Sequence, residues 1–156
     1  MAFWGHLRTA VYIRESAGTI VSSSGKEKQM ITIGIKGCAE CTVTQELTAA
    51  ALGSGLLPVF ATPAAVALAE ECAWKSVAGE LAEGQGTVGT RMDLSHIAAT
   101  PLGMKVRCES ELVEFDRRRL VFAFTLYDEK EKIAEGRHER FVVDSERFLA
   151  KAESKK

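Results

Sequence analysis

One long helical pattern stands among segments that all favour strands, and this single helix constrains the fold more than any other feature. The helix is predicted over Ala64–Ala78, where Thr62-Pro63 supplies a start signal and Gly79 a stop. Threonine is a favoured N-cap, and proline fits the first helical turn because its missing N–H would be unpaired there. The segment is rich in apolar residues, so the helix needs an apolar surface to lie on.

Strand patterns flank this helix on both sides. One precedes it at residues 31–46, with a break at Gly37, and four follow it in meander succession. An antiparallel sheet needs one face covered, and curling it around the helix satisfies both elements. The sequence therefore predicts an α+β hotdog fold, an antiparallel sheet wrapped around one long central helix. The four later strands are expected at Thr87–Ile97, Lys105–Phe115, Leu120–Leu126 and Ile133–Val143.

The chain divides into three parts by composition. Residues 1–29 form an N-terminal extension, disordered or folded as a short hairpin of Val11-Tyr12-Ile13 with Thr19-Ile20-Val21. Residues 30–150 form the hotdog domain, and residues 151–156 are a charged tail. The segment from Ser145 onward is expected to form a short helix. We find no functional signal in residues 1–29.

Composition and charge exclude several classes of partner. The 156 residues carry a net charge of −1, which gives no electrostatic argument for nucleic acid or an anionic membrane. No apolar run reaches the roughly 20 residues that span a bilayer. We expect a cytoplasmic protein with neither nucleic acid nor a membrane as partner.

The four cysteines leave two interpretations open. Cys38-Ala39-Glu40-Cys41 has the spacing of a zinc or redox pair, but no second pair completes four ligands. Residues three apart on a strand also point to opposite faces. Incidental cysteines in a reducing compartment are the favoured interpretation, and no metal site is expected.

Two adjacent glutamates on the helix differ in phase. Glu70 shares its face with Val66, Ala73, Trp74 and Val77, so its carboxylate is predicted to turn toward the sheet, and Trp74 is assigned to the core. Glu71 has Lys75 four residues later, which is typical of an exposed ion pair. A buried carboxylate is costly without partners or a function. The alternative is that Glu70 lies at the edge of the stripe and reaches solvent.

A histidine and a threonine are the other candidates for chemistry. Counting by two places His96 with Val88, Thr90, Met92 and Leu94, on the strand face that should cover the helix. A lone histidine there is often a core residue. Beside a carboxylate, however, an imidazole is held in one tautomer and acts as acid or base near neutral pH. Thr62 has both an N-capping and a catalytic interpretation.

The motifs resemble those of the hotdog thioesterases related to fluoroacetyl-CoA thioesterase. The resemblance covers roughly residues 31–150, in the same order and with similar spacing. It rests on Val59-Phe60-Ala61-Thr62-Pro63 with Glu70-Glu71-Cys72-Ala73, on Gly84-Gln85-Gly86-Thr87-Val88-Gly89-Thr90, on Ser95-His96-Ile97-Ala98-Ala99-Thr100-Pro101-Leu102-Gly103, and on Gly136-Arg137-His138-Glu139-Arg140-Phe141.

This resemblance implies hydrolysis of an acyl-CoA thioester, with coenzyme A as part of the substrate and no separate cofactor. It implies a homodimer or a dimer of dimers with sites at the subunit interface. The catalytic triad carries over to Thr62, Glu70 and His96. The amide of Gly89 is implied as a donor to the thioester carbonyl, with Arg140 in support. By the residues alone, Arg140 either anchors a carboxylate or makes a surface ion pair.

One departure from the family bears on the substrate. The fluoroacetyl-specific enzyme closes its acyl pocket with aromatic residues from the segment before the helix, whereas this chain has Gly53-Ser54-Gly55-Leu56-Leu57 there. A general short or medium acyl-CoA hydrolase is therefore expected. The alternative from another class is a non-catalytic hotdog protein that senses or sequesters acyl-CoA.

Overall fold

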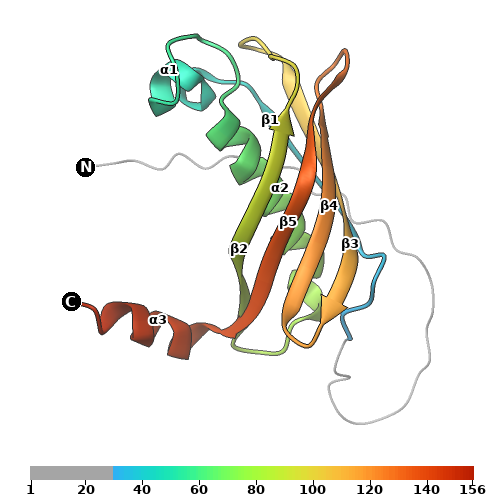
Figure 1. Cartoon of the computed structure of the whole chain (residues 1–156), viewed down its shortest axis with the longest axis vertical. Helices are drawn as coiled ribbons and strands as arrows, with labels where there is room; N and C mark the ends of the chain where they lie inside the picture. The colour runs from blue at the N-terminus through green and yellow to red at the C-terminus, as the bar shows by residue number, and fades with distance from the viewer. Residues whose placement is uncertain (1–29) are drawn as a thin grey trace.

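A five-stranded antiparallel sheet curls around one long helix, α2 (Thr62–Val77), in the computed structural model (Figure 1). The structure describes residues 30–156, so the hairpin predicted within residues 1–29 lies outside the described residues. The hotdog arrangement predicted from the sequence is confirmed. The strands are β1 (Lys36–Thr42), β2 (Gln85–His96), β3 (Lys105–Asp116), β4 (Arg119–Tyr127) and β5 (Lys132–Asp144).

Short helical elements complete the chain. They are the 3-10 turns η1 (Gln45–Leu47) and η2 (Ala78–Glu80), the helical turn α1 (Ala49–Leu52) and the C-terminal helix α3 (Ser145–Glu153). The strand predicted over residues 31–46 is too long at both ends. Before β1, Ile31 and Ile35 lie in a loop that packs against the core. After β1, the chain turns into η1. None of the helices in residues 30–156 has the length and apolarity needed to cross a lipid bilayer.

The order of the strands differs from the predicted meander. The sheet runs β1-β3-β4-β5-β2, so β2 pairs with β5 and β1 pairs with β3. The reason is that α2 lies across one face of the sheet and carries the chain from the β1 edge to the opposite edge. β3, β4 and β5 then form the predicted meander between the two edge strands. One long side of β2 consequently has no neighbouring strand in the described part of the chain.

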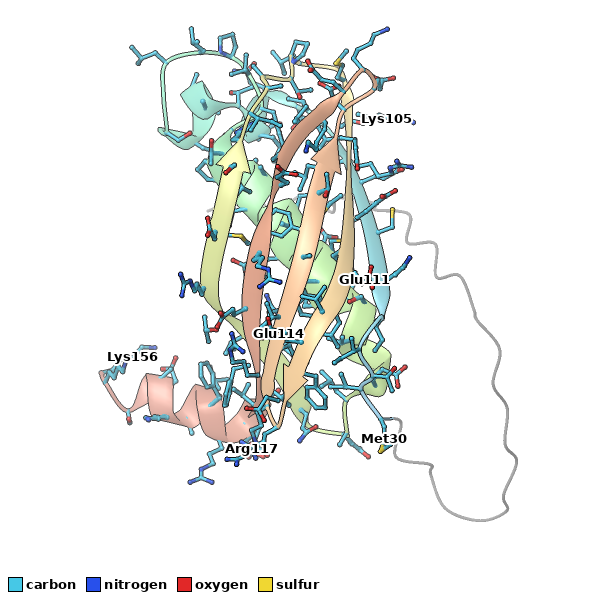
Figure 2. The ribbon with its side chains drawn as sticks, turned by 45° about the vertical axis from the view of Figure 1, so that its right-hand side comes forward. Met30, Lys105, Glu111, Glu114, Arg117 and Lys156 are labelled. Atoms are coloured by element: carbon cyan, nitrogen blue, oxygen red, sulfur yellow. The ribbon has the colours of Figure 1, made fainter. Side chains whose placement is uncertain are left out.

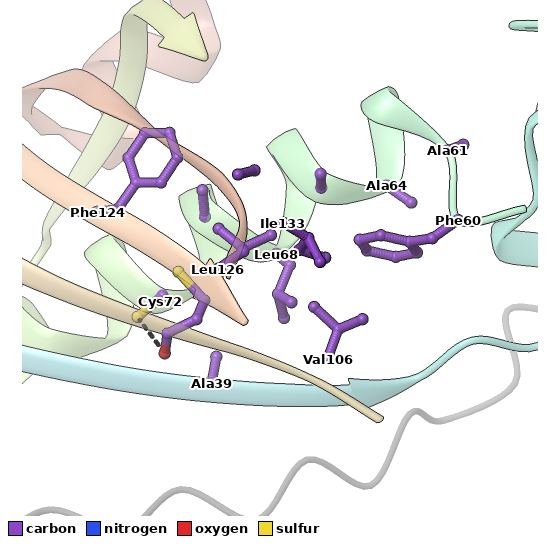
Figure 3. Close-up of a cluster of buried hydrophobic side chains, with 14 of the residues drawn as sticks. Ala39, Phe60, Ala61, Ala64, Leu68, Cys72, Val106, Phe124, Leu126 and Ile133 are labelled. Atoms are coloured by element: carbon purple, nitrogen blue, oxygen red, sulfur yellow. Dashed lines mark hydrogen bonds between the residues drawn. The ribbon is translucent and has the colours of Figure 1, made fainter. Parts of the chain in front are cut away.

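The core lies between α2 and the concave face of the sheet (Figure 3). The inner face of α2 is built mainly from small residues, which let the sheet approach the helix closely. Opposite them, the larger side chains come from the strands. The buried helix residues are Ala64, Ala65, Leu68, Ala69, Cys72, Ala73 and Val77, and the strand residues around them include Val106, Phe124, Leu126 and Ile133.

Two side chains on the helix and its flanks depart from the predicted positions. Trp74 is 42% exposed, so its assignment to the core was wrong. Thr62 was predicted as the N-cap, but the helix begins at Thr62 itself and Ala61 is the N-cap residue. The hydroxyl of Thr62 is therefore free of the capping role.

A bulge in β2 changes which residues face the helix. The register with β5 shifts between Gly89 and Arg91, so Thr90 is the extra residue. Beyond the bulge Met92 and Leu94 pack on the core as predicted, but Val88 pairs with the exposed Phe141 on the outer face. Placing Val88 and Thr90 on the same face as His96 was wrong, because a bulge shifts the two-residue period by one.

The outer face of the sheet is charged. Glu111 and Glu114 stand out from β3 (Figure 2), and Arg119 bridges Glu114 and Glu139 across three strands. These ion pairs are largely exposed, so their contribution to stability is small. The candidate site residues lie instead on the concave face of the sheet and along α2.

Candidate active site

The two segments that precede α2 and follow β2 lie side by side. The backbone N–H of Phe60 donates to the carbonyl of Thr100 over 2.9 Å, and Val59 and Pro101 form an isolated antiparallel bridge. The hydroxyl of Thr100 is fully buried and donates to Asp128 Oδ2 over 3.0 Å. The Thr-Pro part of the second motif thus fixes the position of the first motif.

This pairing brings together the hydroxyl and the imidazole predicted from the sequence. Thr62 Oγ1 and His96 Nδ1 are hydrogen-bonded at 2.9 Å. The ring of Phe60 meets the His96 ring edge-on, with centroids 6.4 Å apart and an interplanar angle of 79°. Thr62 and Phe60 therefore hold the imidazole from two sides.

The other ring nitrogen of His96 is available. Nε2 is buried and has no hydrogen-bond partner in the described part of the chain, residues 30–156. A buried polar atom of this kind normally pairs with a protein group, water or ligand. Burial lowers the pKa of His96 below its usual 6.5, so the ring is neutral at pH 7.

A cavity of about 310 Å³ opens beside this pair, with Thr62 and His96 in its wall. The volume is at the lower end of the range for small-molecule sites. Apart from Ser54, Thr62 and His96, its lining consists of Ala49, Val59, Phe60, Ile97, Ala98 and Ala99. The cavity therefore presents the Thr62–His96 pair among side chains that, except for Ser54, are apolar.

The predicted carboxylate lies in a second polar cluster. Glu70 Oε2 accepts from Arg140 Nη1 over 3.1 Å and lies 3.9 Å from His138 Nε2. Glu70 turns toward the sheet as predicted, but its side chain is 40% exposed, so the alternative that it lies at the edge of the stripe and reaches solvent also holds. Glu71 makes the predicted ion pair with Lys75, but the pair is partly buried rather than exposed, with the Glu71 side chain 29% exposed.

Arg140 is held firmly within this cluster. Its guanidinium is buried, with Nε donating to Thr87 Oγ1 and Nη2 to the Thr87 carbonyl, each over 2.8 Å. Burial lowers the pKa of Arg140, and the contact with Glu70 opposes that shift. An arginine remains protonated even so, and it keeps a positive charge beside the carboxylate. Arg140 therefore makes an interior ion pair rather than a surface one.

Gly89 leaves the space that Glu70 occupies. A Cβ built on Gly89 would lie 2.8 Å from Glu70 Oε2 and 3.1 Å from His138 Cε1. Any side chain at this position would push the carboxylate away. Gly89 thus lies next to Glu70 and pairs with Arg140 across the β2–β5 ladder.

The two polar clusters are separate within one protomer. Glu70 follows Thr62 by eight residues on α2, a rise of about 12 Å. No hydrogen bond or ion pair joins Glu70 to Thr62 or His96 in residues 30–156. The structure brings Thr62 to His96 and Glu70 to Gly89 and Arg140, but it does not connect the two groups.

Two members of the second cluster were not singled out by the sequence. His138 lies two residues before Arg140 on β5, and Thr87 two residues before Gly89 on β2, so each pair shares a strand face. This two-residue spacing from Arg140 and Gly89 was the sequence signal that could have identified His138 and Thr87. Cys38 and Cys41 point to opposite faces of β1, and residues 30–156 contain no group of three or more acidic, histidine or cysteine side chains arranged to hold a metal.

The comparisons with known proteins show which family the chain belongs to. Residues 43–146 match the family model described as fluoroacetyl-CoA-specific thioesterase. The chain belongs to this family. It is therefore an acyl-CoA thioesterase, and the resemblance inferred from the motifs is confirmed.

Individual relatives support the same assignment. The fluoroacetyl-CoA thioesterase of Streptantibioticus cattleyicolor is 38% identical over 97 residues, which are 62% of this chain and 70% of that protein. A solved structure of a fluoroacetyl-CoA thioesterase superposes with a TM-score of 0.77 at 31% identity, covering 81% of this chain and 98% of the other. A hot-dog-like protein from Thermanaerovibrio acidaminovorans shares the fold, with a TM-score of 0.74 at 20% identity over 84% of this chain and 97% of the other.

Proposed function

We propose that this family member hydrolyses a small acyl-CoA thioester to a free acid and coenzyme A, using Thr62, Glu70 and His96, with Gly89 and Arg140 binding the substrate. The observation that carries the proposal is the hydrogen bond between Thr62 and His96 in the wall of a cavity of about 310 Å³. Coenzyme A enters as part of the substrate, and the reaction we propose needs no separate cofactor.

The proposed roles follow from the hydrogen-bonding capacity of each group. If His96 Nδ1–H donates to Thr62 Oγ1, Nε2 is unprotonated and takes a proton from water, while the Thr62 hydroxyl donates to the thioester carbonyl. The water oxygen then bonds to the carbonyl carbon, the carbon–sulfur bond breaks, and the departing thiolate takes from His96 Nε2 the proton that came from water. Arg140 donates to Glu70 Oε2 and so orients the carboxylate for action as a base or a nucleophile.

We propose a homodimer, or a dimer of dimers, as the active form. β2 offers twelve residues whose outer edge has no partner strand in the described chain, and an exposed edge of this length favours pairing with another strand. A two-fold axis would run two copies of β2 antiparallel and set the partially exposed side of α2, with Glu70 and Trp74, near its counterpart. The gap between the two clusters favours a site completed across this interface.

The expected substrate is a short or medium acyl chain without strict fluoroacetyl preference. Leu56 is 95% exposed and no aromatic side chain occurs from Gly53 to Val59, so the acyl pocket lacks an aromatic cover from this segment. A thiol-release assay across acetyl-, fluoroacetyl-, branched, medium-chain and aromatic acyl-CoAs tests this. A strong preference for fluoroacetyl-CoA would contradict it.

The catalytic assignment is tested by Glu70→Gln and His96→Ala, with Glu71→Gln as the matched control one position along the helix. Because a general base contributes about 10²–10⁴-fold, the first two changes should lower kcat by at least 100-fold and the control should not. Calorimetric binding of acyl-CoA by wild-type protein, with no thiol released, would favour the non-catalytic acyl-CoA-binding function instead.

Mixed dimers test whether the site crosses the interface. Protomers carrying Glu70→Gln and protomers carrying His96→Ala are co-expressed with two different affinity tags, and the heterodimer is isolated by using both tags. If one copy supplies His96 and the other Glu70, this heterodimer regains one intact site, whereas a wild-type subunit paired with the double variant has none. Activity in the second pairing and none in the first would place each complete site within one protomer.

A further inference from the structure

His138 is almost wholly buried in the middle of the charged cluster. Its side chain is 1% exposed, and β2 and β4 flank it through its cross-strand neighbours Met92 and Phe122. A histidine in such a place is costly unless both ring nitrogens have partners. The proposed catalytic roles above do not use it.

The partners of His138 fix its protonation state. Arg140 Nη1 lies 3.0 Å from His138 Nε2, and a guanidinium can only donate, so Nε2 must be the acceptor. His138 Nδ1 lies 2.9 Å from the carbonyl of Arg91, which can only accept, so Nδ1 carries the hydrogen. The ring is therefore a neutral tautomer whose two hydrogen bonds point in opposite directions.

These contacts determine where Arg140 points. Thr87 accepts from Nε and Nη2 on one side of the guanidinium, and His138 accepts from Nη1 on the other. Nη1 is then left in line with Glu70 Oε2, at 3.1 Å. Among residues 30–156, the protein binds Glu70 through Oε2, so the other carboxylate oxygen faces no protein donor there and is available to water or substrate.

We propose that His138 is a positioning residue, which holds Arg140 so that Glu70 is presented through one oxygen in a fixed orientation. The bulge at Thr90 contributes to this arrangement. Its register shift determines the position of the Arg91 carbonyl, which accepts the hydrogen bond from His138 Nδ1. The proposal rests on the proposed function of Glu70 and extends it to a residue that does not touch the substrate.

Two substitutions separate positioning from packing. Gln at position 138 can donate to the Arg91 carbonyl and accept from Arg140, whereas Leu fills the space and does neither. We expect His138→Leu to lower kcat about 10- to 100-fold with KM within about threefold, since misplacing a reacting group by 1 Å costs roughly that much. His138→Gln should restore most of the loss. Leu126→Ala, in the core away from Glu70, controls for destabilisation.

A second readout does not depend on turnover. The Nε–H resonance of Arg140, assigned with Arg140→Lys in a ¹⁵N spectrum of the full chain, should be slow to exchange in wild type and His138→Gln and lost in His138→Leu. Equal kcat for His138→Leu and wild type, or a His138→Gln variant no better than His138→Leu, would overturn the proposal. An inactive wild type with the expected resonances would overturn the proposed function instead, while leaving the role of His138 in holding Arg140 supported.

Discussion

Thr62 Oγ1 lies 2.9 Å from His96 Nδ1 although 34 residues separate them in the chain. The contact exists because Ala61, not Thr62, caps α2, which leaves the hydroxyl free to reach the end of β2. It also depends on Phe60 bonding to Thr100, which sets the two segments side by side.

Thr62→Val should lower kcat without lowering stability. Valine keeps the shape of the side chain but removes the hydrogen bond to His96, so we expect a loss of about tenfold or more. Since Thr62 does not cap the helix, the free energy of unfolding should change by no more than about 0.5 kcal/mol. Thr62→Ser is the control and should retain activity. A loss of about 1 kcal/mol in urea unfolding of Thr62→Val would point to an N-cap after all.

Gly89→Ala should disable the Glu70 cluster. The added methyl group would lie 2.8 Å from Glu70 Oε2, so the carboxylate must move away. We expect a drop in kcat of about tenfold or more and a loss of roughly 1–3 kcal/mol in the free energy of unfolding. Gly79→Ala, where a Cβ would meet no atom within 4 Å, should leave both unchanged. Similar effects of the two substitutions would show that crowding at Glu70 is not the cause.

Mild acid should destabilise the folded protein through its buried histidines. Burial lowers the pKa of both His96 and His138, so below pH 6.5 the unfolded chain binds more protons than the folded chain. Stability is therefore highest above that pH and falls on acidification, by up to about 1.4 kcal/mol per pH unit for each histidine.

Urea unfolding at intervals from pH 7 to pH 5 measures this slope, above the range in which the carboxylates protonate. His138→Gln removes one of the two buried imidazoles and should flatten the curve. An unchanged slope in that variant would mean that His138 does not titrate differently in the folded and unfolded chains.

Thr100→Val should loosen the segment between β2 and β3. The Thr100 hydroxyl donates to Asp128, and this bond helps to lower the pKa of that carboxyl. A hydrogen bond to a charged group is worth about 1.5–3 kcal/mol, and this one is partly buried, so thermal unfolding should show a loss toward the lower end of that range. Thr125→Val, on the outer face of β4, is the control. If the two valines cost the same, the Thr100–Asp128 bond contributes nothing specific.

Local patterns predicted much of this fold because they reflect short-range physics. The helix period separated Glu70 from Glu71, and the Lys75 pair of Glu71 followed directly from four-residue spacing. The hairpin turns near Arg117 and Asp128 also follow from local chain chemistry. Trp74 was wrongly assigned to the core, because helix periodicity gives the width of the buried stripe only approximately. In the structure Trp74 lies outside that stripe and is 42% exposed.

Other features required the whole sheet. The bulge at Thr90 has no clear local signature, yet it decides that Gly89 rather than Val88 faces the helix. The pairing of β2 with β5 is a choice between distant strands, and it creates the cluster of Arg140, His138 and Thr87. The residues alone left Arg140 between a carboxylate anchor and a surface ion pair and assigned His138 no role, and this pairing buries both side chains.

By itself the sequence determined the single helix wrapped by a sheet, the residue types of the site and the thioesterase family, because these depend on side-chain periodicity and on motifs read along the chain. Only the tertiary structure decided how those residues are grouped. It joins Thr62 to His96, places Glu70 with Gly89 and Arg140, and keeps the two groups apart along α2. The physical reason is that hydrogen-bond geometry acts over about 3 Å, whereas sequence patterns specify faces and not distances.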